Sequence, residues 1–480
     1  MGQHRVQIQI VPNRYFPPQM NMVISRHLAR KLHLQQHTIW TAFGSAAGTG
    51  LVALTQTQSP LIRISASLAH HLHLTQQLSI NARYDPKGRV LRFGPILGIL
   101  INQDVQENEI DQPFGAMTRF LEECILAGKN RGVVVSVLRP EEILLENKTV
   151  QGWVYEQNQW QKVLLPLPDV VYNRITSRRI EAQPKLQQKI QQLRNLHHIS
   201  IFNERFLDKQ QVYDILKRDP EIRAMLPETY PFSPNILRIM LMKYPCLYLK
   251  PTNGSLGNGI IRVTNHGGGV TCQYTSATRN LTHTVRSVPE AVKRLQRRIR
   301  RSPYIIQQGL TLVRENGRPI DFRVLVQKNI HGEWAVTSTV GRVANDQDIV
   351  SNLARGGTLR KAEEVLLSLQ VPHKPTPAQL RAKAIQIAQT FEQLSDGHYA
   401  ELGIDLAMDI QGKLWLLEIN SKPSKTDDTV TNPTLATRPS VSRLIDYTCH
   451  LCGLVPSAKR RRNIKHRRKS NLSGGKPDER

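Results

Sequence analysis

Hydrophobic and polar positions change along the chain in short blocks, which predict strands and helices in mixed order. In the first ninety residues, the pattern of residues 24–36 recurs at residues 64–76, with eight of the thirteen positions identical. Each copy predicts a strand, a short helix with leucine at positions i and i+4, and a second strand. Two copies are too few for a solenoid, so the repeat predicts a small β-rich domain with internal pseudo-symmetry.

A different alternation starts near residue 93 and predicts an α/β layer. Its predicted strands cover 96–101, 132–138, 151–155, 160–164, 170–175 and 199–202, and its predicted helices cover 113–126 and 183–196. From residue 203 to about 454 the pattern predicts one long α+β segment. Apolar residues become rare beyond Pro456, so the basic residues that follow predict a disordered tail.

Charge narrows the choice of partners. The 480 residues contain 65 Lys and Arg against 38 Asp and Glu, for a formal net charge of +27. Residues 458–480 contribute +8 of this, which leaves +19 on the rest of the chain. A body this basic predicts polyanionic partners such as nucleotides, nucleic acid or acidic polymers.

Apolar content and cysteine usage limit the cellular class. The longest apolar run has about eight residues, well short of the ~20 that span a bilayer. The first residues lack an apolar signal core, and five cysteines in this length predict a reducing compartment. We therefore expect a cytoplasmic protein without a membrane span.

The strongest local pattern for chemistry covers residues 403–420. Two alternating arms flank a Gln-Gly dipeptide, which predicts a β-hairpin with a two-residue turn. Counting back from this turn pairs Asp405 with Glu418 and puts Asn420 on the same face. Opposed carboxylates repel each other unless a cation is near, and the three oxygen donors suit Mg²⁺ shared with phosphates. The alternative is a solvated hairpin face.

Two further patterns suit phosphate binding. An apolar strand ends at Lys250, and a Gly- and Ser-rich loop over 254–259 leads into a second strand. Glycines let backbone N–H groups turn toward phosphate oxygens, and lysine adds a point charge. Arg323 lies on a strand whose other face is apolar, and Arg355 precedes a double glycine. Arginine binds two oxygens at once; a plain hairpin and surface arginines are the alternatives.

Together these residues resemble the ATP-grasp superfamily over about residues 203–454. The stretch 351–357 is very close to the Ser-Asn-Leu-x-Arg-Gly-Gly segment of RimK-type amino-acid ligases. The whole chain looks like the YheC/YheD family of endospore coat-associated proteins. The motifs that carry this likeness lie at 93–98, 171–175, 316–321 and 418–424.

The resemblance implies an α+β multidomain protein with an ATP-grasp fold, in which two α+β subdomains clasp ATP. An α/β pre-ATP-grasp layer and the small β-rich repeat domain precede this fold. The expected parts are a β-rich domain at 1–92, a pre-ATP-grasp domain at 93–200, an ATP-grasp domain at 201–455 with its lid at about 230–310, and the basic tail at 456–480.

The resemblance also implies a site for ATP and Mg²⁺, with Mn²⁺ as the alternative ion. The implied nucleotide contacts are Lys209, Lys250, Gly254, Ser255, Gly257, Gly259, Gln307, Gln308, Gly309 and Leu310. The implied metal ligands are Asp405, Glu418 and Asn420, and the implied catalytic residues are Arg323, Arg342, Asn352 and Arg355. Gln308 stands where many members have an acidic residue, so Thr311 or Glu315 is expected at the ribose.

The reaction implied by the resemblance activates a carboxylate as an acyl phosphate and joins it to an amine, such as that of an amino acid or peptide. Both substrates remain unidentified. One alternative is a non-catalytic, nucleotide-binding structural protein of the spore coat. Another is a polyanion- or nucleic-acid-binding protein that acts through the basic tail, with spore coat proteins or acidic polymers as partners. Association with the spore coat is the alternative to a purely cytoplasmic location.

Three weaker patterns favour ordinary structural roles. The histidines near the repeat lack the carboxylates or cysteines of a metal site, so we expect them at the surface. Cys449 and Cys452 have the spacing of a zinc half-site without a second pair nearby, which favours a helix end. The basic stretch 292–301 lacks aromatic residues for base stacking, so a solvated helix face is expected.

Overall fold

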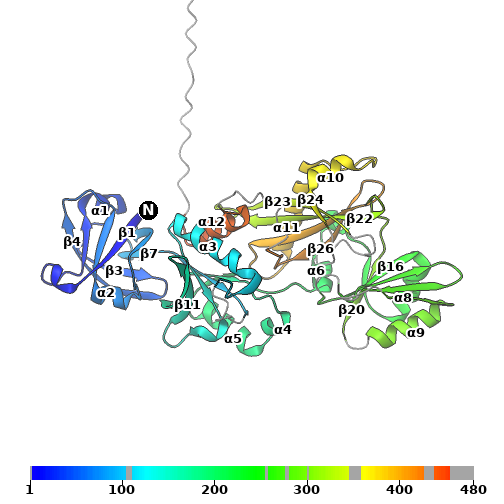
Figure 1. The fold of residues 1–480 in the computed structure, drawn as a ribbon, viewed down its shortest axis with the longest axis horizontal. Helices are drawn as coiled ribbons and strands as arrows, with labels where there is room; N and C mark the ends of the chain where they lie inside the picture. The colour runs from blue at the N-terminus through cyan, green and yellow to red at the C-terminus, as the bar shows by residue number, and fades with distance from the viewer. Residues whose placement is uncertain are drawn as a thin grey trace, which may run out of the picture.

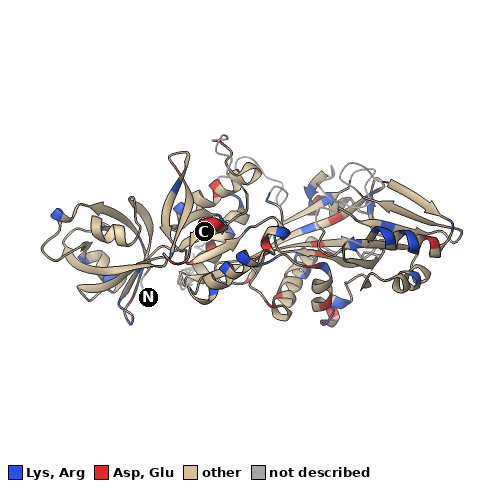
Figure 2. Cartoon of the chain, turned by 90° about the horizontal axis from the view of Figure 1, so that it is seen from below, with Lys and Arg blue, Asp and Glu red and all other residues tan. Residues whose placement is uncertain are grey.

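A computed structural model describes residues 3–103, 111–254, 258–275, 281–299, 302–344, 358–425 and 437–454. The chain is elongated: a barrel lies at one end, a middle sheet follows, and two further sheets make up the other end (Figure 1). Lys and Arg residues are spread over the length of the chain, with Asp and Glu residues among them (Figure 2). Among the helices of these described ranges, none combines the length and apolar character needed to cross a membrane.

The N-terminal residues form a closed barrel with the strand order β1-β5-β2-β4-β3-β7-β6. Its elements are β1 (Gln3–Val11), β2 (Met22–Ser25), α1 (Arg26–Leu32), β3 (Thr38–Phe43), β4 (Ala46–Thr55), β5 (Leu61–Ser65), α2 (Ala66–His71), β6 (Leu78–Asp85) and β7 (Val90–Phe93).

The sequence repeat appears in the barrel as a local twofold relation. Strands β2 and β5 pair antiparallel, and Val23 lies opposite Arg63, its equivalent 40 positions later. Ser25 and Ser65 begin the equivalent helices, and each side chain accepts a hydrogen bond from the backbone N–H three residues on. This is the usual role of an N-cap serine. The repeat is therefore real in structure, and closure into a barrel leaves no exposed sheet edge.

The middle sheet has the order β10-β11-β9-β8-β13-β14, with β12 paired to β11 outside this path. Its elements are β8 (Ile96–Leu100), α3 (Thr118–Arg131), β9 (Val134–Leu138), β10 (Ile143–Leu144), β11 (Thr149–Glu156), β12 (Gln159–Pro166), β13 (Val170–Asn173), α4 (Arg178–Glu181), α5 (Pro184–Asn195) and β14 (Ser200–Phe202). Strands β8, β9, β13 and β14 run parallel.

The chain reverses direction within this sheet. From β8 it passes through α3 to β9 on one side, and it later returns to β13 on the other side of β8. Helix α3 packs in one hydrophobic cluster and α5 in another, and the two clusters use alternate residues of the same strands. The helices therefore cover opposite faces of the sheet.

The predicted helix over 113–126 is wrong at both ends. Helix α3 begins at Thr118, whose hydroxyl accepts a hydrogen bond from the backbone N–H of Phe114 at 3.0 Å. The residues before it form a 3-10 turn, and Gly115 has a φ of +55° that an α-helix does not allow. The helix ends at Arg131, because Gly132 adopts the left-handed conformation of a C-cap.

Two further sheets follow. The distal sheet has the order β15-β20-β16-β17-β18-β19, and α8 and α9 pack on it. Its elements, with the two helices that precede them, are α6 (Lys209–Leu216), α7 (Pro220–Arg223), β15 (Thr229–Pro231), α8 (Pro234–Lys243), β16 (Cys246–Pro251), β17 (Ile261–Asn265), β18 (Val270–Tyr274), β19 (Leu281–Val285), α9 (Val288–Ile299) and β20 (Tyr304–Gln308).

The hairpin sheet has the order β24-β23-β22-β25-β26, with β21 paired to β22 outside this path. Its elements are β21 (Arg314–Glu315), β22 (Arg318–Lys328), β23 (Trp334–Val343), β24 (Thr358–Lys361), α10 (Ala362–Ser368), α11 (Pro377–Leu394), β25 (Glu401–Met408), β26 (Leu414–Asn420) and α12 (Pro439–Leu451). Helices α6 and α11 share its hydrophobic core. Helix α12 instead packs beside α3, so it connects this sheet to the middle sheet (Figure 1).

Candidate functional site

The hairpin of β25 and β26 places Asp405 opposite Glu418, as predicted. The predicted two-residue turn is wrong, because Met408 pairs with Leu414 and a five-residue loop joins the strands. The carboxylate of Asp409 organises this loop by accepting hydrogen bonds from the backbone N–H groups of two loop residues. A register shift after Asp405 then restores the pairing. The wider loop moves the pairing by one residue from the predicted register, and the register shift moves it back by one, so Asp405 still lies opposite Glu418.

Asp405 is buried and is held by two arginines from the neighbouring strands. Arg323 lies directly across from it on β22 and binds both of its carboxylate oxygens. Arg342, on β23, lies 2.9 Å from the carboxylate and also pairs with Asp321. Burial alone would raise the pKa of Asp405, but Arg323 and Arg342 hold the pKa of this carboxyl below its ordinary value.

Glu418 is held by the lysine at the start of α6. The Nζ of Lys209 lies 3.0 Å from Oε1 of Glu418 and donates to the carbonyl of Gly254 at 2.7 Å. Asp208 caps α6, which fixes the position of Lys209 at the first residue of the helix. A single lysine thus connects the hairpin with the beginning of the glycine loop.

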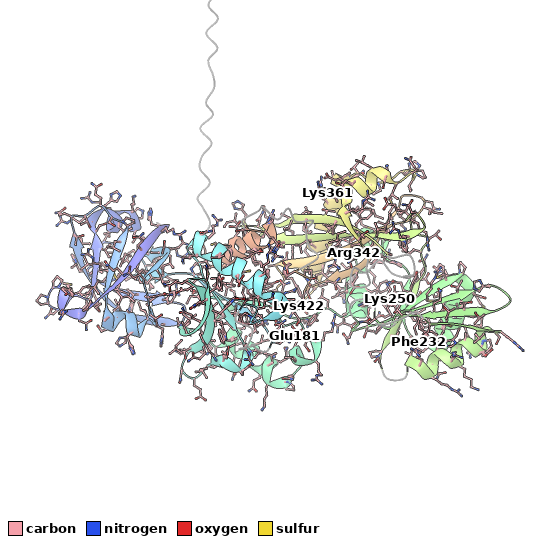
Figure 3. All side chains as sticks on the ribbon, in the orientation of Figure 1. Glu181, Phe232, Lys250, Arg342, Lys361 and Lys422 are labelled. Atoms are coloured by element: carbon pink, nitrogen blue, oxygen red, sulfur yellow. The ribbon has the colours of Figure 1, made fainter. Side chains whose placement is uncertain are left out.

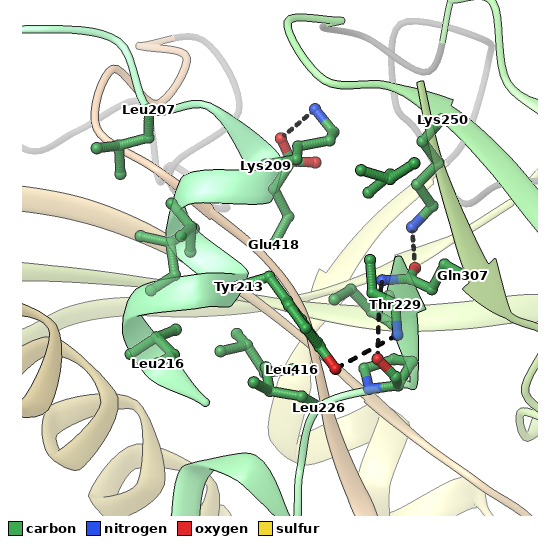
Figure 4. A pocket seen from close by; sticks show the side chains of 15 residues that line it. Leu207, Lys209, Tyr213, Leu216, Leu226, Thr229, Lys250, Gln307, Leu416 and Glu418 are labelled. Atoms are coloured by element: carbon green, nitrogen blue, oxygen red, sulfur yellow. Dashed lines mark hydrogen bonds and ion pairs between the residues drawn. The ribbon is translucent and has the colours of Figure 1, made fainter. Parts of the chain in front are cut away.

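Lys250 approaches the same place from the distal sheet. Its Nζ donates to Oε1 of Gln307 at 2.6 Å, and the amide of Gln307 donates to the hydroxyl of Thr229 at 3.0 Å (Figure 4). Burial lowers the pKa of Lys250 to about 8, although the carboxylates of Glu418 and Asp405 oppose that shift. A bound anion such as a phosphate would stabilise the charged form of this buried lysine, because the anion would compensate its charge.

A pocket opens between these groups and has an apolar wall below them (Figure 4). Side chains of α6 and the residues just before it, of the segment before β15 and of β26 form this wall: Leu207, Val212, Tyr213, Leu216, Leu226 and Leu416. Lys209, Lys250 and Glu418 line the polar part. An apolar wall with a few convergent charged groups suits a ligand with a flat ring and a phosphate tail. The sequence patterns did not single out these apolar residues, because core leucines and pocket leucines share the same periodicity.

The donor set for a divalent cation is chemically suitable. Asp405, Glu418 and Asn420 offer only oxygen atoms, the type of ligand that Mg²⁺ prefers. Their strands form one hairpin, and in the described chain both carboxylates are already compensated by arginine or lysine. The opposition of two carboxylates therefore does not by itself require a metal, and the case for Mg²⁺ rests on the oxygen donors beside a phosphate-binding pocket.

The glycine loop of 254–259 is only partly described, whereas the predicted nucleotide contacts at 307–310, which we call the hinge, all lie within the described residues. Ser255 and Gly257 lie outside the described residues. Gly259 has a φ of +75°, and its carbonyl accepts a hydrogen bond from the hydroxyl of Tyr304 at 3.0 Å. In the hinge, Gly309 packs so closely on the carbonyl of Cys246 that a Cβ would lie 2.6 Å from the oxygen. A side chain at this position would therefore push the two strands apart.

Glu315, one of the two residues expected at the ribose, is already paired with an arginine. Glu315 lies 2.6 Å from the guanidinium of Arg360 and also accepts a hydrogen bond from Ser368. The side chain of Gln308 accepts a hydrogen bond from the backbone N–H of Glu228. Thr311 is exposed, so its side chain could contact a ribose without first breaking an ion pair, and it stays a prediction. Asn352 and Arg355, the predicted catalytic pair, lie outside the described residues.

A second group of charged residues, without an assigned role in the sequence patterns, lies close to the site. It consists of Arg174, Arg178, Glu181 and Lys422; Arg178 and Lys422 lie over the ring of Phe206, Lys422 pairs with Glu181, and Arg174 acts on Lys422 through its charge. Figure 3 labels Glu181 and Lys422 where the middle sheet meets the end of β26. Two of the family motifs, 171–175 and 418–424, contain members of this group, so the signal was present but carried no chemical interpretation.

The weaker sequence patterns agree with ordinary roles. His27, His33, His37, His70 and His71 are exposed, and among the described residues no group of three or more His, Cys, Asp or Glu side chains is arranged for a metal ion. Burial raises the pKa of both Cys449 and Cys452, which disfavours the thiolates that zinc needs. The basic side chains of α9 at positions 293, 294, 297 and 298 are exposed.

Comparison with known proteins identifies the family of this chain. Residues 198–451, slightly more than half of the chain, match the YheC/D like ATP-grasp family, and the chain belongs to this family. Members of the ATP-grasp superfamily are ATP-dependent carboxylate–amine ligases that use Mg²⁺. The fold of this chain is accordingly the ATP-grasp fold with preceding α/β and β-rich parts.

Two proteins of Bacillus subtilis (strain 168) are similar in sequence. Endospore coat-associated protein YheD is 28% identical over 395 residues, which cover 82% of this chain and 86% of YheD. Endospore coat-associated protein YheC is 24% identical over 292 residues, which cover 60% of this chain and 79% of YheC.

Solved structures of lower similarity include two synthetases. The D-cycloserine synthetase DcsG is 15% identical with a TM-score of 0.45, covering 73% of this chain and 99% of its own. The D-alanine-D-alanine ligase from Coxiella burnetii is 13% identical with a TM-score of 0.40, covering 75% of this chain and 95% of its own.

Proposed function

We propose that this member of the YheC/D like ATP-grasp family is an ATP- and Mg²⁺-dependent ligase that joins a carboxylate to an amine. One observation carries the proposal. Lys209 and Lys250 converge with Glu418 on one pocket, and the Asp405 cluster with its two arginines lies beside them. Lysines and arginines supply charge for a polyphosphate, while the carboxylates and Asn420 suit Mg²⁺.

The residues of this chain would act by positioning and by charge. Lys209, Lys250 and the backbone of the glycine loop would hold phosphate oxygens, and the apolar wall of the pocket would receive the adenine ring. Mg²⁺ on Asp405, Glu418 and Asn420 would neutralise charge on the phosphates. Phosphoryl transfer needs little covalent work from the protein, so such preorganised charge is adequate for catalysis.

The proposed reaction has two steps. A carboxylate oxygen of the substrate bonds to the γ-phosphorus of ATP as the bond to the β–γ bridging oxygen breaks, which releases ADP and leaves an acyl phosphate. The nitrogen of an amine then bonds to the acyl carbon, phosphate leaves, and the amine loses a proton. Arg323 and Arg342 are the described cations paired with Asp405, and they would stabilise charge on the transferred oxygens.

Glu418→Ala tests this proposal. We expect loss of Mg·ATP binding, measured by calorimetry on the full-length protein, because the variant removes both a predicted metal ligand and the partner of Lys209. Glu364→Ala is the matched control, since Glu364 is an exposed acid on α10 and should leave binding unchanged. Wild-type affinity in the Glu418 variant would show that the pocket does not bind Mg·ATP through this face.

The names of the two Bacillus subtilis proteins favour a second candidate, a nucleotide-binding structural protein of the spore coat without turnover. Binding measurements do not separate this candidate from a ligase. Phosphate release does: a ligase releases phosphate from ATP only when a suitable carboxylate and amine are present. A screen of amino acids, peptides and acidic polymers, with mass analysis of the products, would distinguish the two.

A further inference from the structure

Arg174 is a buried arginine whose guanidinium is only partly hydrogen-bonded. It follows β13 directly and is only 3% exposed. Its Nη2 donates to the carbonyl of Pro423, but Nε and Nη1 have no hydrogen-bond partner in the described structure. Buried polar groups are nearly always paired, and a buried cation with open donors costs stability. Such a group suggests a partner that binds from outside the chain.

The neighbours of Arg174 do not balance its charge. Lys422, whose side chain is 2% exposed, pairs with Glu181, and Arg178 stacks at 4.6 Å over the ring of Phe206. The two oxygens of Glu181 also accept hydrogen bonds from the amide of Asn173 and the backbone N–H of Phe206. This carboxylate is therefore fully engaged. The three cations and one acid of the group carry a net charge of +2 by themselves, and Glu418 and Asp208 act on Arg178 from outside the group.

The position of this group in the fold is typical of a ligand site. Parallel strands β8 and β13 are adjacent, and the chain leaves them in opposite directions, so their carboxyl ends form a topological switch point. Ligands of open α/β sheets bind at such points. Thr176 is exposed at this edge, and its backbone N–H donates to the side chain of Asn102 at 2.6 Å. A ligand would reach the arginines from this side.

The same group adjoins the phosphate pocket. Arg178 donates to the carbonyl of Leu207, the residue two before Lys209, at 3.0 Å. The carboxylate of Glu418 also interacts electrostatically with the Arg178 side chain. Lys422 is only two residues beyond Asn420, the last of the predicted metal ligands. A ligand bound by these cations would therefore lie beside the γ-phosphate end of the proposed ATP site.

We infer that Arg174, Arg178 and Lys422 form a subsite that binds a carboxylate of the substrate, one that is not itself phosphorylated. The inference rests on the proposed ligase function and specifies its substrate class: a compound with a second carboxylate, such as an amino acid, a peptide or a dicarboxylic acid. Guanidinium groups suit this role because they bind two carboxylate oxygens with fixed geometry.

Binding of small anions to the full-length protein tests the subsite. The probes are glutarate, L-glutamate and inorganic phosphate, with Mg²⁺ and the non-hydrolysable ATP analogue AMP-PNP measured in parallel by calorimetry. Arg174→Met is the main variant and Arg178→Met the second, so that failure of one to fold does not end the test. Arg179→Met is the matched control, because Arg179 is exposed on the same short helix.

We expect a carboxylate probe to bind the wild type at least tenfold more tightly than the Arg174 and Arg178 variants. The control should match the wild type, and Mg·AMP-PNP affinity should change less than twofold in every variant. The inference is overturned by equal carboxylate binding in the Arg174 variant, by binding of inorganic phosphate alone, or by no binding of either carboxylate. A tenfold loss of Mg·AMP-PNP affinity would also overturn it, since the group would then belong to the triphosphate site.

The same data separate this inference from the proposed function. If the wild type does not bind Mg·AMP-PNP, the ligase proposal fails, whatever the carboxylate probes do. If Mg·AMP-PNP binds and the carboxylate probes do not distinguish Arg174→Met from the wild type, only the subsite fails. Glu418→Ala provides an independent check, because it should lose Mg·AMP-PNP and retain the carboxylate probe.

Discussion

Two buried clusters of charge differ in one respect: one contains the predicted metal ligand Asp405, and the other includes Arg174 and Lys422, the latter two residues beyond Asn420. Around Asp405, two arginines meet two aspartates, so the formal charges cancel. Around Arg174, three cations meet the single carboxylate of Glu181. The side chains of both clusters are buried or half-buried, yet only in the first is every charged group paired with an opposite charge within the described chain.

The difference separates two uses of buried charge. In the balanced cluster each ion has a partner at hydrogen-bond distance, which fixes the positions of the strands and the direction of each side chain. In the second cluster, Nε and Nη1 of Arg174 have no hydrogen-bond partner among the described residues. A bound anion that pairs with them would therefore stabilise the protein. We expect removal of a charge to be costly in the first cluster and tolerated in the second.

Asp405→Asn should have the largest effect. The substitution leaves Arg323 and Arg342 buried without a full counter-charge, which costs about 3–5 kcal/mol of unfolding free energy. Urea denaturation followed by circular dichroism measures this loss. Asp214→Asn provides the control, because Asp214 pairs with Lys217 at the surface and should cost less than about 1 kcal/mol. Equal losses in the two variants would remove the distinction between a balanced buried cluster and a surface pair.

Lys250 should give the phosphate pocket a pH dependence. Burial lowers its pKa to about 8, and Glu418, Asp405, Asp321 and Lys209 are the charged groups that act on it. Below pH 8 the lysine is charged and binds phosphate, and as the pH rises through 8 it loses its proton. Nucleotide affinity should therefore fall, by up to about tenfold from pH 7 to pH 9.

The substitution Lys250→Arg sharpens this test, since arginine keeps its charge over the whole range. The measurement is the affinity for Mg·AMP-PNP as a function of pH in wild type and variant. The difference between the two profiles isolates Lys250 from the titration of the nucleotide. Parallel profiles would mean that Lys250 does not contact the phosphates in its charged form.

Arg174→Met should have the smallest effect on stability in the absence of ligand, within about 1 kcal/mol. The variant loses the hydrogen bond to Pro423 but also removes a buried charge with open donors, and these two terms oppose each other. Urea denaturation without added anions checks this. A loss above about 3 kcal/mol would show that the second cluster is as complete as the first, and would break the comparison.

The hairpin shows how far sequence reasoning could reach. Period-two alternation identified both strands and the face on which each side chain lies, because a strand pattern fixes which side chains share a face. The predicted pairing of Asp405 with Glu418 is correct only because a register shift offsets the wrong loop length. The pattern misjudged the loop, since the bonds from Asp409 to backbone N–H groups are tertiary details of one turn. The compensating register shift left no trace in the hydrophobic pattern.

Other parts of the site could not be read in this way. The cations that compensate Asp405 and Glu418 come from β22, β23 and α6, far away in sequence. Arg174 and Lys422 are separated by almost 250 positions, and no local period connects them. The apolar wall of the pocket was hidden among core leucines, because burial in a pocket and burial in a core use the same residue types.

The repeat, the order of most strands and helices, the two strands of the hairpin and the family could be read from the sequence alone, because each is encoded in local periodicity or in contiguous motifs. The closure of the repeat into a barrel and the return of α12 to the middle sheet became visible in the three-dimensional fold. That fold also decided which buried charges cancel and which do not. Electrostatic energy depends on the distance in space between two charges. For residues far apart in the chain, sequence spacing does not give that distance.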